Sequence, residues 1–346
     1  AFCFIAAVKN ITARSFESES AMIHTQLTSR FLIKHPVVLA PMGSVSGGTL
    51  AAAVSNAGGL GLIGAGYGDP EWLSQQLALF QQASQGEPWG VGFITWAIEP
   101  DVLQIALTAK PSVIMLSFGD PRPYADDIHR AGSRLICQVQ DLAGAKLAQE
   151  AGAAAVVAQG SEGGGHGGKR GSLSLIPAVV DLLGPSTPVI AAGGLADGRG
   201  LAAALMLGAQ GVLMGTRFYA SQEALGHQAA KQKIVEASGD HTMHTHVFDI
   251  VRGYKWPDGH TGRALQNRFL EQWHGSESAL AAEQEQLAPA FWEALEKADY
   301  DTAMVWAGEV VDLIASVDSA AQIIERVVQE AAKCLANANQ LLLQDS

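Results

Sequence analysis

Eight short apolar runs are the feature that most limits what this sequence can fold into. Most of them start about 20–25 residues apart, and each is followed by glycine and then by a helical pattern. The runs are apolar continuously rather than at alternate positions, which is typical of strands buried on both faces in a parallel sheet. They cover residues 37–40, 59–63, 91–95, 113–117, 134–139, 155–159, 189–193 and 211–215.

The segments between these runs have the spacing and end signals of amphipathic helices. Several open with Pro or Asp near the first turn, and several stop at Ala-Gly or Leu-Gly-Ala. The expected helices cover residues 49–56, 70–82, 100–108, 121–131, 141–151, 173–183 and 197–207. Eight strand–helix alternations predict a (β/α)8 TIM barrel over residues 22–218. A doubly wound open sheet is the alternative, although it usually has fewer strands.

The pattern changes after the eighth run. Residues 219–299 lack further strand-like runs and are interpreted as a helical insertion over the C-terminal mouth of the barrel. Residues 300–346 are expected to form a C-terminal helical segment on the outside of the barrel, because apolar residues from Ile323 onward recur at helical spacing. Residues 1–21 are interpreted as a leader or a non-native extension, with Met22 as the working start.

Composition excludes several classes of partner. The chain carries 22 Lys and Arg against 34 Asp and Glu, a net charge of −12, which argues against nucleic acid and against an anionic membrane surface. The three cysteines (Cys3, Cys137 and Cys334) are far apart and form no CxxC pair, so neither a disulfide framework nor a metal cage is indicated. A cytoplasmic protein is expected, and a homodimer is left open.

One loop stands out as a ligand site. The run ending at Gln159 leads into residues 161–168, where five of eight positions are glycine and His166 lies among them. Glycine lets backbone approach a ligand closely, and parallel α/β folds place ligands where strands end. A flexible surface loop with a solvated histidine is the alternative.

Two further glycine turns suggest a phosphate grip. The runs at 189–193 and 211–215 lead into Gly193-Gly194 and into Gly215-Thr216, where backbone N–H groups and a helix N-terminus can face an anion. The alternative is that these glycines only close tight turns. Together with the His166 loop, the turns favour FMN, with its ring near Pro41-Met42-Gly43 and Gln159.

The same residues carry a family resemblance. The sequence is similar to the nitronate monooxygenases, formerly 2-nitropropane dioxygenases, from about residue 35 to 218. The likeness lies in Ala40-Pro41-Met42, residues 51–61, Gln159-Gly160 with Gly164-Gly165-His166, residues 191–194 with 197–200, and residues 214–218.

The resemblance implies an FMN-dependent enzyme that oxidises alkyl nitronates, such as propionate 3-nitronate, with O2 to a carbonyl product and nitrite. His166 matches the family's active-site histidine, either as a general base or as a protonated anchor for the nitronate. The cofactor-binding positions would be Pro41, Met42, Gly43, Gly92, Gln138, Gln159, Gly164, Gly165, Gly193, Gly194, Leu213, Met214, Gly215 and Thr216.

Two departures from the family pattern keep other functions open. Many members carry Asn where this chain has Gly92, and some carry Lys where it has Gln138. A loss of these contacts would alter flavin binding or potential. An NAD(P)H-dependent flavin reductase, similar to enoyl-acyl-carrier-protein or quinone reductases, is therefore an alternative, as is a non-catalytic flavin-binding protein.

Three further patterns give weaker signals. His241, His244 and His246 have metal-like spacing without an acidic or cysteine partner, so a metal site is not expected. The glycines of residues 64–68 are read as a turn, because the third glycine of a dinucleotide loop is missing. Tyr254 and Trp256 either line the pocket or serve only in packing.

Overall fold

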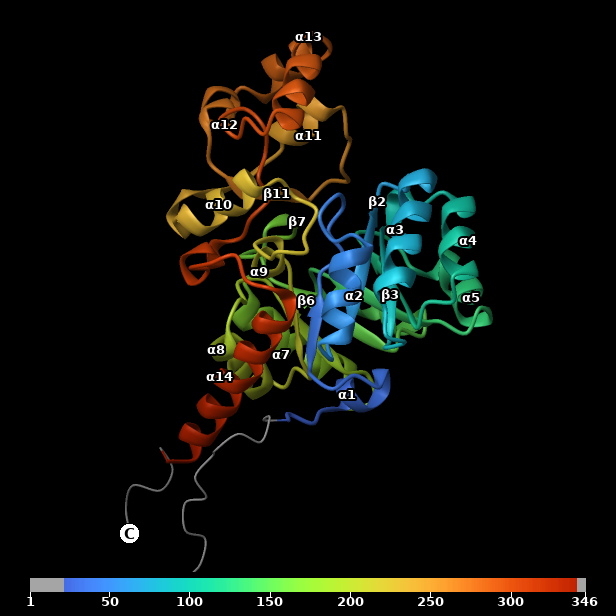
Figure 1. Ribbon diagram of the computed structural model, residues 1–346. Coiled ribbons are helices and arrows are strands. Elements are labelled where there is room, and N and C mark those ends of the chain that lie inside the picture. The colour runs from blue at the N-terminus through green and yellow to red at the C-terminus, as the bar shows by residue number, and fades with distance from the viewer. Residues whose placement is uncertain (1–21, 341–346) are drawn as a thin grey trace, which may run out of the picture.

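A computed structural model describes residues 22–340 and shows the expected barrel (Figure 1). Eight parallel strands are ordered β1-β9-β8-β6-β5-β4-β3-β2, and backbone hydrogen bonds joining Leu60 to Val37 and Leu39 link the first strand to the second. The strands are β1 (Val37–Leu39), β2 (Gly61–Gly66), β3 (Trp89–Ile94), β4 (Val113–Ser117), β5 (Arg134–Val139), β6 (Ala155–Gln159), β8 (Val189–Ala192) and β9 (Val212–Met214). All eight predicted strands are confirmed.

The helices between the strands also follow the prediction to within one or two residues. They are α2 (Gly48–Asn56), α3 (Pro70–Ala83), α4 (Pro100–Thr108), α5 (Arg122–Arg130), α6 (Leu142–Glu150), α7 (Ser172–Leu183) and α8 (Gly198–Met206). Asp69, Asp141 and Asp197 cap α3, α6 and α8 by accepting hydrogen bonds from backbone N–H groups of the first turn. The capping residues therefore fix where these helices begin.

The barrel interior is a packed core rather than a channel. Leu62, Met115, Val157 and Ile190 are fully buried within it together with other strand residues. The short helix α1 (Gln26–Phe31), which was not predicted, adds Leu27 and Phe31 to the same cluster. The opposite faces of the strands pack against the surrounding helices. Burial on both faces explains the continuous apolar runs.

The region after the barrel contains strands as well as helices, so the prediction of an insertion without strands was wrong. Its elements are α9 (Thr216–Tyr219), α10 (Gln228–Glu236), η2 (Gly239–His241), β10 (Thr242–Thr245), α11 (Val247–Arg252), β11 (Thr261–Leu265), α12 (Arg268–Trp273) and α13 (Glu277–Glu296). Strand β11 pairs antiparallel with both β10 and β7 (Gly165–Gly167), and β7 belongs to the glycine loop. β10 and β11 are short and largely polar, so they give no apolar run.

The inserted region has a small core of its own. Phe248, Leu270, Leu280 and Phe291 are almost completely buried in one cluster with Val247 and Val251. Helices α11, α12 and α13 gather at one end of the molecule, and β7 and β11 lie between them and the barrel (Figure 1). We call this region, residues 220–319, the cover.

The last helix covers only part of the expected C-terminal helical segment. Residues 300–319 contain only the 3-10 helix η3 (Glu309–Leu313), and α14 (Ala320–Gln340) follows. Its buried residues Ile323, Ile324, Val327 and Val328 confirm the predicted apolar face, which packs against α8 and α2. The expectation for residues 1–21 concerns positions outside the described residues.

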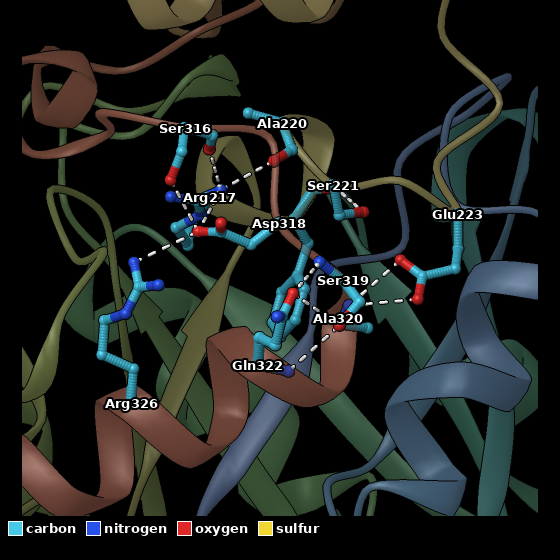
Figure 2. Close-up of polar contacts among 11 residues, drawn as sticks. Arg217, Ala220, Ser221, Glu223, Ser316, Asp318, Ser319, Ala320, Gln322 and Arg326 are labelled. Atoms are coloured by element: carbon cyan, nitrogen blue, oxygen red, sulfur yellow. Dashed lines mark hydrogen bonds and ion pairs between the residues drawn. The ribbon is translucent and has the colours of Figure 1, made fainter.

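A polar cluster joins the barrel to the start of α14 (Figure 2). The buried guanidinium of Arg217 donates hydrogen bonds to the carbonyl oxygens of Ala220 and Ser316, at 2.7 and 2.6 Å. Asp318 lies 3.8 Å from Arg217 and also accepts from Arg326 at 3.1 Å. We call this cluster the Arg217 clasp.

No helix among residues 22–340 is long and apolar enough to cross a membrane.

Candidate active site

His166 lies in β7, at the C-terminal ends of the barrel strands. Its backbone pairs with Gly262 of β11, and Gly165 before it has a φ of 72°, which glycine tolerates at no steric cost. The Gln159 side chain donates to the His166 carbonyl oxygen at 2.9 Å. Strand β7 is thus held from both sides, by the cover and by the end of β6.

A set of glutamines orients Gln159. The amide nitrogens of Gln138 and Gln140 both donate to Gln159 Oε1, at 3.1 and 2.8 Å. Gln138 therefore reaches the His166 loop through Gln159. Gln140 was missed, because a polar residue just past a strand gives no distinctive sequence signal.

The His166 imidazole contacts three side chains that the cover supplies. Its Nε2 lies 2.8 Å from Oδ2 of Asp249, which is on α11. The Trp256 indole stacks on the ring with centroids 3.5 Å apart and planes 4° apart, and Trp306 lies 5.1 Å away. Trp256 therefore lies at the candidate site, as the pocket-lining alternative for this residue requires.

Burial lowers the pKa of His166 below its usual value. Asp249 opposes this shift by its hydrogen bond and charge, whereas Arg252 and His260 add to the lowering. Burial dominates because the ring exposes only 9% of its side-chain surface. The lowered pKa favours the neutral imidazole, and Nε2 lies within hydrogen-bond distance of the Asp249 carboxylate.

Several buried polar atoms near His166 have no hydrogen-bond partner among residues 22–340. They are Asp249 Oδ1, Arg252 Nε and His260 Nδ1. Arg252 lies 3.7 Å from Asp249 Oδ1, and its guanidinium sits over the Tyr254 ring at 4.6 Å. Because buried polar groups are normally paired, this concentration of unpaired atoms marks a place suited to a polar ligand.

The Pro41-Met42 turn lies across the ends of β2 and β3. A Cβ atom on Gly92 would come within 2.3 Å of the Pro41 ring, and one on Gly64 would come within 2.5 Å of the Met42 backbone. The Pro41 ring thus takes the space that a side chain at Gly92 would need. Gly64 and Gly66 belong to β2, so reading residues 64–68 as a turn alone was wrong; the strand shifts register there.

The phosphate-type turns approach the His166 loop closely. Gly193 and Gly194 have φ values of 96° and 70°, and a Cβ on Gly193 would meet the Gly160 carbonyl oxygen at 2.6 Å. The Thr216 hydroxyl accepts a hydrogen bond from Gly308 N–H at 3.1 Å. Helix α9, which follows Gly215, has only four residues, so its dipole is small.

The remaining predicted cofactor positions fall into three groups. Gly164 packs against Ala307 and Gly308 of the cover, where a Cβ would be only 2.5 Å from backbone atoms. Leu213 and Met214 are buried in β9 and belong to the interior and exterior cores of the barrel. Gly43 and Gly215 line the same turn region, with the Met42 sulfur 3.5 Å from the Gly215 Cβ position.

A cavity of about 380 Å3 reaches the Gly193-Gly194 turn between α7, α8 and η3. Its lining includes Glu162, Ser172 and the apolar side chains of Leu173, Ile176 and Leu207. Glu162 already accepts hydrogen bonds from the backbone and hydroxyl of Ser172, at the first turn of α7. His166 does not line this cavity.

The histidine triplet is dispersed. His244 in β10 bonds to the Ser161 carbonyl oxygen and to the Thr261 hydroxyl, both at 2.9 Å. His241 ends η2, and His246 precedes α11. Over the described range 22–340, no cluster of three or more His, Cys, Asp or Glu side chains is placed to hold a metal ion.

Comparisons with known proteins identify the family. The family model described as nitronate monooxygenase matches residues 24–97 and 96–330. The chain belongs to the nitronate monooxygenase family. It is 36% identical to nitronate monooxygenase npaC of Metarhizium robertsii, an alignment that covers 86% of this chain and 91% of that protein.

Two solved structures share the fold. FabK of Thermotoga maritima is 33% identical with a TM-score of 0.83, over 92% of this chain and 99% of FabK. A nitroalkane oxidase of Streptomyces ansochromogenes is 27% identical with a TM-score of 0.77, over 90% of this chain and 99% of that one. The protein is therefore a flavin-dependent oxidoreductase of this family, acting on a small molecule.

Proposed function

We propose that the protein is an FMN-dependent nitronate monooxygenase that uses O2 to oxidise alkyl nitronates, such as propionate 3-nitronate, to a carbonyl compound and nitrite. The observation that carries this proposal is the buried His166 at the barrel mouth, 2.8 Å from Asp249 and stacked on Trp256, with burial lowering its pKa. The family match and the likeness to a nitroalkane oxidase support it.

The residues at the mouth suit a flat phosphorylated cofactor. Gly193 and Gly194 lack side chains beside the cavity, so their backbone can approach a phosphate closely. Gly215 and Thr216 would complete the phosphate grip, and Pro41, Met42 and Gln159 would lie near the ring. Bound FMN would supply the electron acceptor and the O2 chemistry.

The chain's own residues then have two tasks. The neutral imidazole of His166 can take a proton from a nitroalkane, and once protonated it can hold the resulting anion by charge. Trp256 and Trp306 exclude water around it, which strengthens both interactions. Cytoplasmic location and dimer formation stay predictions.

The test begins with the visible spectrum of the purified protein, which should show a bound flavin. Adding propionate 3-nitronate under air should give nitrite, whereas mixing anaerobic protein with NADH should leave the flavin oxidised. Rapid bleaching by NADH would instead support the reductase alternative. Turnover with neither compound would support a non-catalytic flavin-binding protein.

His166→Asn sharpens the test. This variant should retain flavin but lose about 10²–10⁴-fold in turnover of a neutral nitroalkane, the usual contribution of a positioned base. Flavin content measured by absorbance serves as the control for folding. Normal turnover in this variant would contradict the role of His166.

A further inference from the structure

The contact between His166 and Asp249 leaves the two ring nitrogens in different situations. Nε2 is 2.8 Å from a carboxylate oxygen whose side chain is only 2% exposed. Nδ1 has no hydrogen-bond partner among residues 22–340, yet it is absent from the fully buried unpaired atoms, so it still borders accessible space. An ionised carboxylate can only accept, so a neutral imidazole beside it must carry its proton on Nε2.

We propose that Asp249 is a positioning residue that holds the His166 proton on Nε2 and thereby keeps Nδ1 as the base that faces the substrate. The proposal rests on the proposed function for its substrate, but the assignment of the proton does not. Asp249 comes from α11 in the cover, more than 80 residues after His166. The barrel therefore supplies the base, and the cover decides which of its nitrogens is basic.

The step assigned to His166 is a proton transfer that needs no further reactant. His166 Nδ1 takes a proton from the carbon next to the nitro group, and the C–H electron pair stays with the substrate as the nitronate. The imidazole becomes an imidazolium, and Asp249 compensates its charge. A nitronate supplied as the anion skips this step, so the two substrate forms depend differently on Asp249.

Because Arg252 lies beside Asp249, the isosteric variant Asp249→Asn can test the position of the His166 proton. Its guanidinium lies 3.7 Å from Asp249 Oδ1, the oxygen that does not contact His166. In Asp249→Asn the amide oxygen would turn toward this cation, which places the amide NH2 against His166 Nε2. The NH2 group can only donate, so the histidine proton would move to Nδ1 and the base would be lost.

The experiment uses protein labelled with 15N-histidine, with the His166 signals assigned by difference from His166→Asn. Wild-type protein should show a protonated Nε2 and an unprotonated Nδ1, and Asp249→Asn should show the reverse. In the same variant, turnover of a neutral nitroalkane should fall about 10²–10⁴-fold, whereas turnover of preformed nitronate should fall less than about tenfold. Asp249→Glu keeps the carboxylate and should restore part of the nitroalkane activity.

Arg252→Gln is the matched control, because it removes the other half of the ion pair and leaves the His166–Asp249 contact. It should keep the wild-type proton position, although Arg252, Asp249 and His260 all face the ring. An unchanged proton position in Asp249→Asn would overturn the proposal. So would equal losses for nitroalkane and nitronate, which would indicate a structural role. If the wild type oxidised no nitro compound, the NMR result would still decide the proton position.

Discussion

The barrel and the cover are held in place by different kinds of interaction. Neighbouring strands of the barrel are joined by backbone hydrogen bonds in a regular register, and its cores are almost entirely apolar. The cover is attached by a three-stranded ladder at β7 and by side-chain contacts such as the Arg217 clasp. Strand pairing and burial of apolar side chains therefore determine the scaffold. Individual side-chain contacts determine the surroundings of His166.

This difference indicates that residues around His166 can be substituted more easily in the cover than in the barrel. Barrel strands that face neighbours on both sides tolerate few changes, because a shift in one strand disturbs the next. The cover places Asp249, Trp256 and Trp306 against one imidazole through a few contacts. Substitutions in the contacts that attach the cover, such as the Arg217 clasp, should destabilise its packing on the barrel. Substitutions in the barrel should disturb the turns that are proposed to bind the cofactor.

Arg217→Ala should have the largest effect on stability. It removes two hydrogen bonds from a buried cation and leaves Asp318 without its buried partner. We expect a loss of about 2–4 kcal/mol in the free energy of unfolding, since breaking a buried charged pair costs several kcal/mol. Denaturant unfolding followed by fluorescence measures it.

Arg326→Ala is the control for this cluster. Its side chain is 53% exposed although it bonds to the same Asp318, so the expected loss is at most about 1 kcal/mol. Equal losses for the two variants would show that the clasp works through surface charge alone.

Gly92→Ala should cost less and act within the barrel. The added Cβ would lie 2.3 Å from the Pro41 ring, which cannot rotate away, so we expect about 1–3 kcal/mol of destabilisation and a shift of the Pro41-Met42 turn. The shift should appear as altered flavin affinity, measured by fluorescence titration. Gly43→Ala, whose Cβ would be 3.4 Å from Gly66, should be nearly neutral in stability.

The barrel could be predicted from the sequence because a strand buried on both faces needs a continuous run of apolar residues. The sequence also singled out the Gly193-Gly194 turn, where both glycines have positive φ; the roles of this turn and of His166 stay predictions. It missed Asp249 and the strands β10 and β11, because tertiary pairing stabilises these polar residues and nothing periodic marks them. An isolated Asp within the apolar residues 247–251 was the available signal, since a buried carboxylate needs a partner.

Trp256→Ala should give the smallest effect, and it tests whether the cover sets the basicity of His166. The indole shields one face of the ring, and burial is the main cause of its lowered pKa. Removing the indole lets water reach the imidazole, so its pKa should rise toward about 6.5. The base is active when neutral, so the acidic limb of the pH profile for nitroalkane turnover should move to higher pH, by less than about one unit.

Trp256→Phe keeps a stacked ring and should shift the limb less. Trp72→Ala, on the outer helix α3, should leave it in place. A limb that moved to lower pH in Trp256→Ala would mean that water weakens the pKa-raising contact with Asp249 more than it relieves the effect of burial.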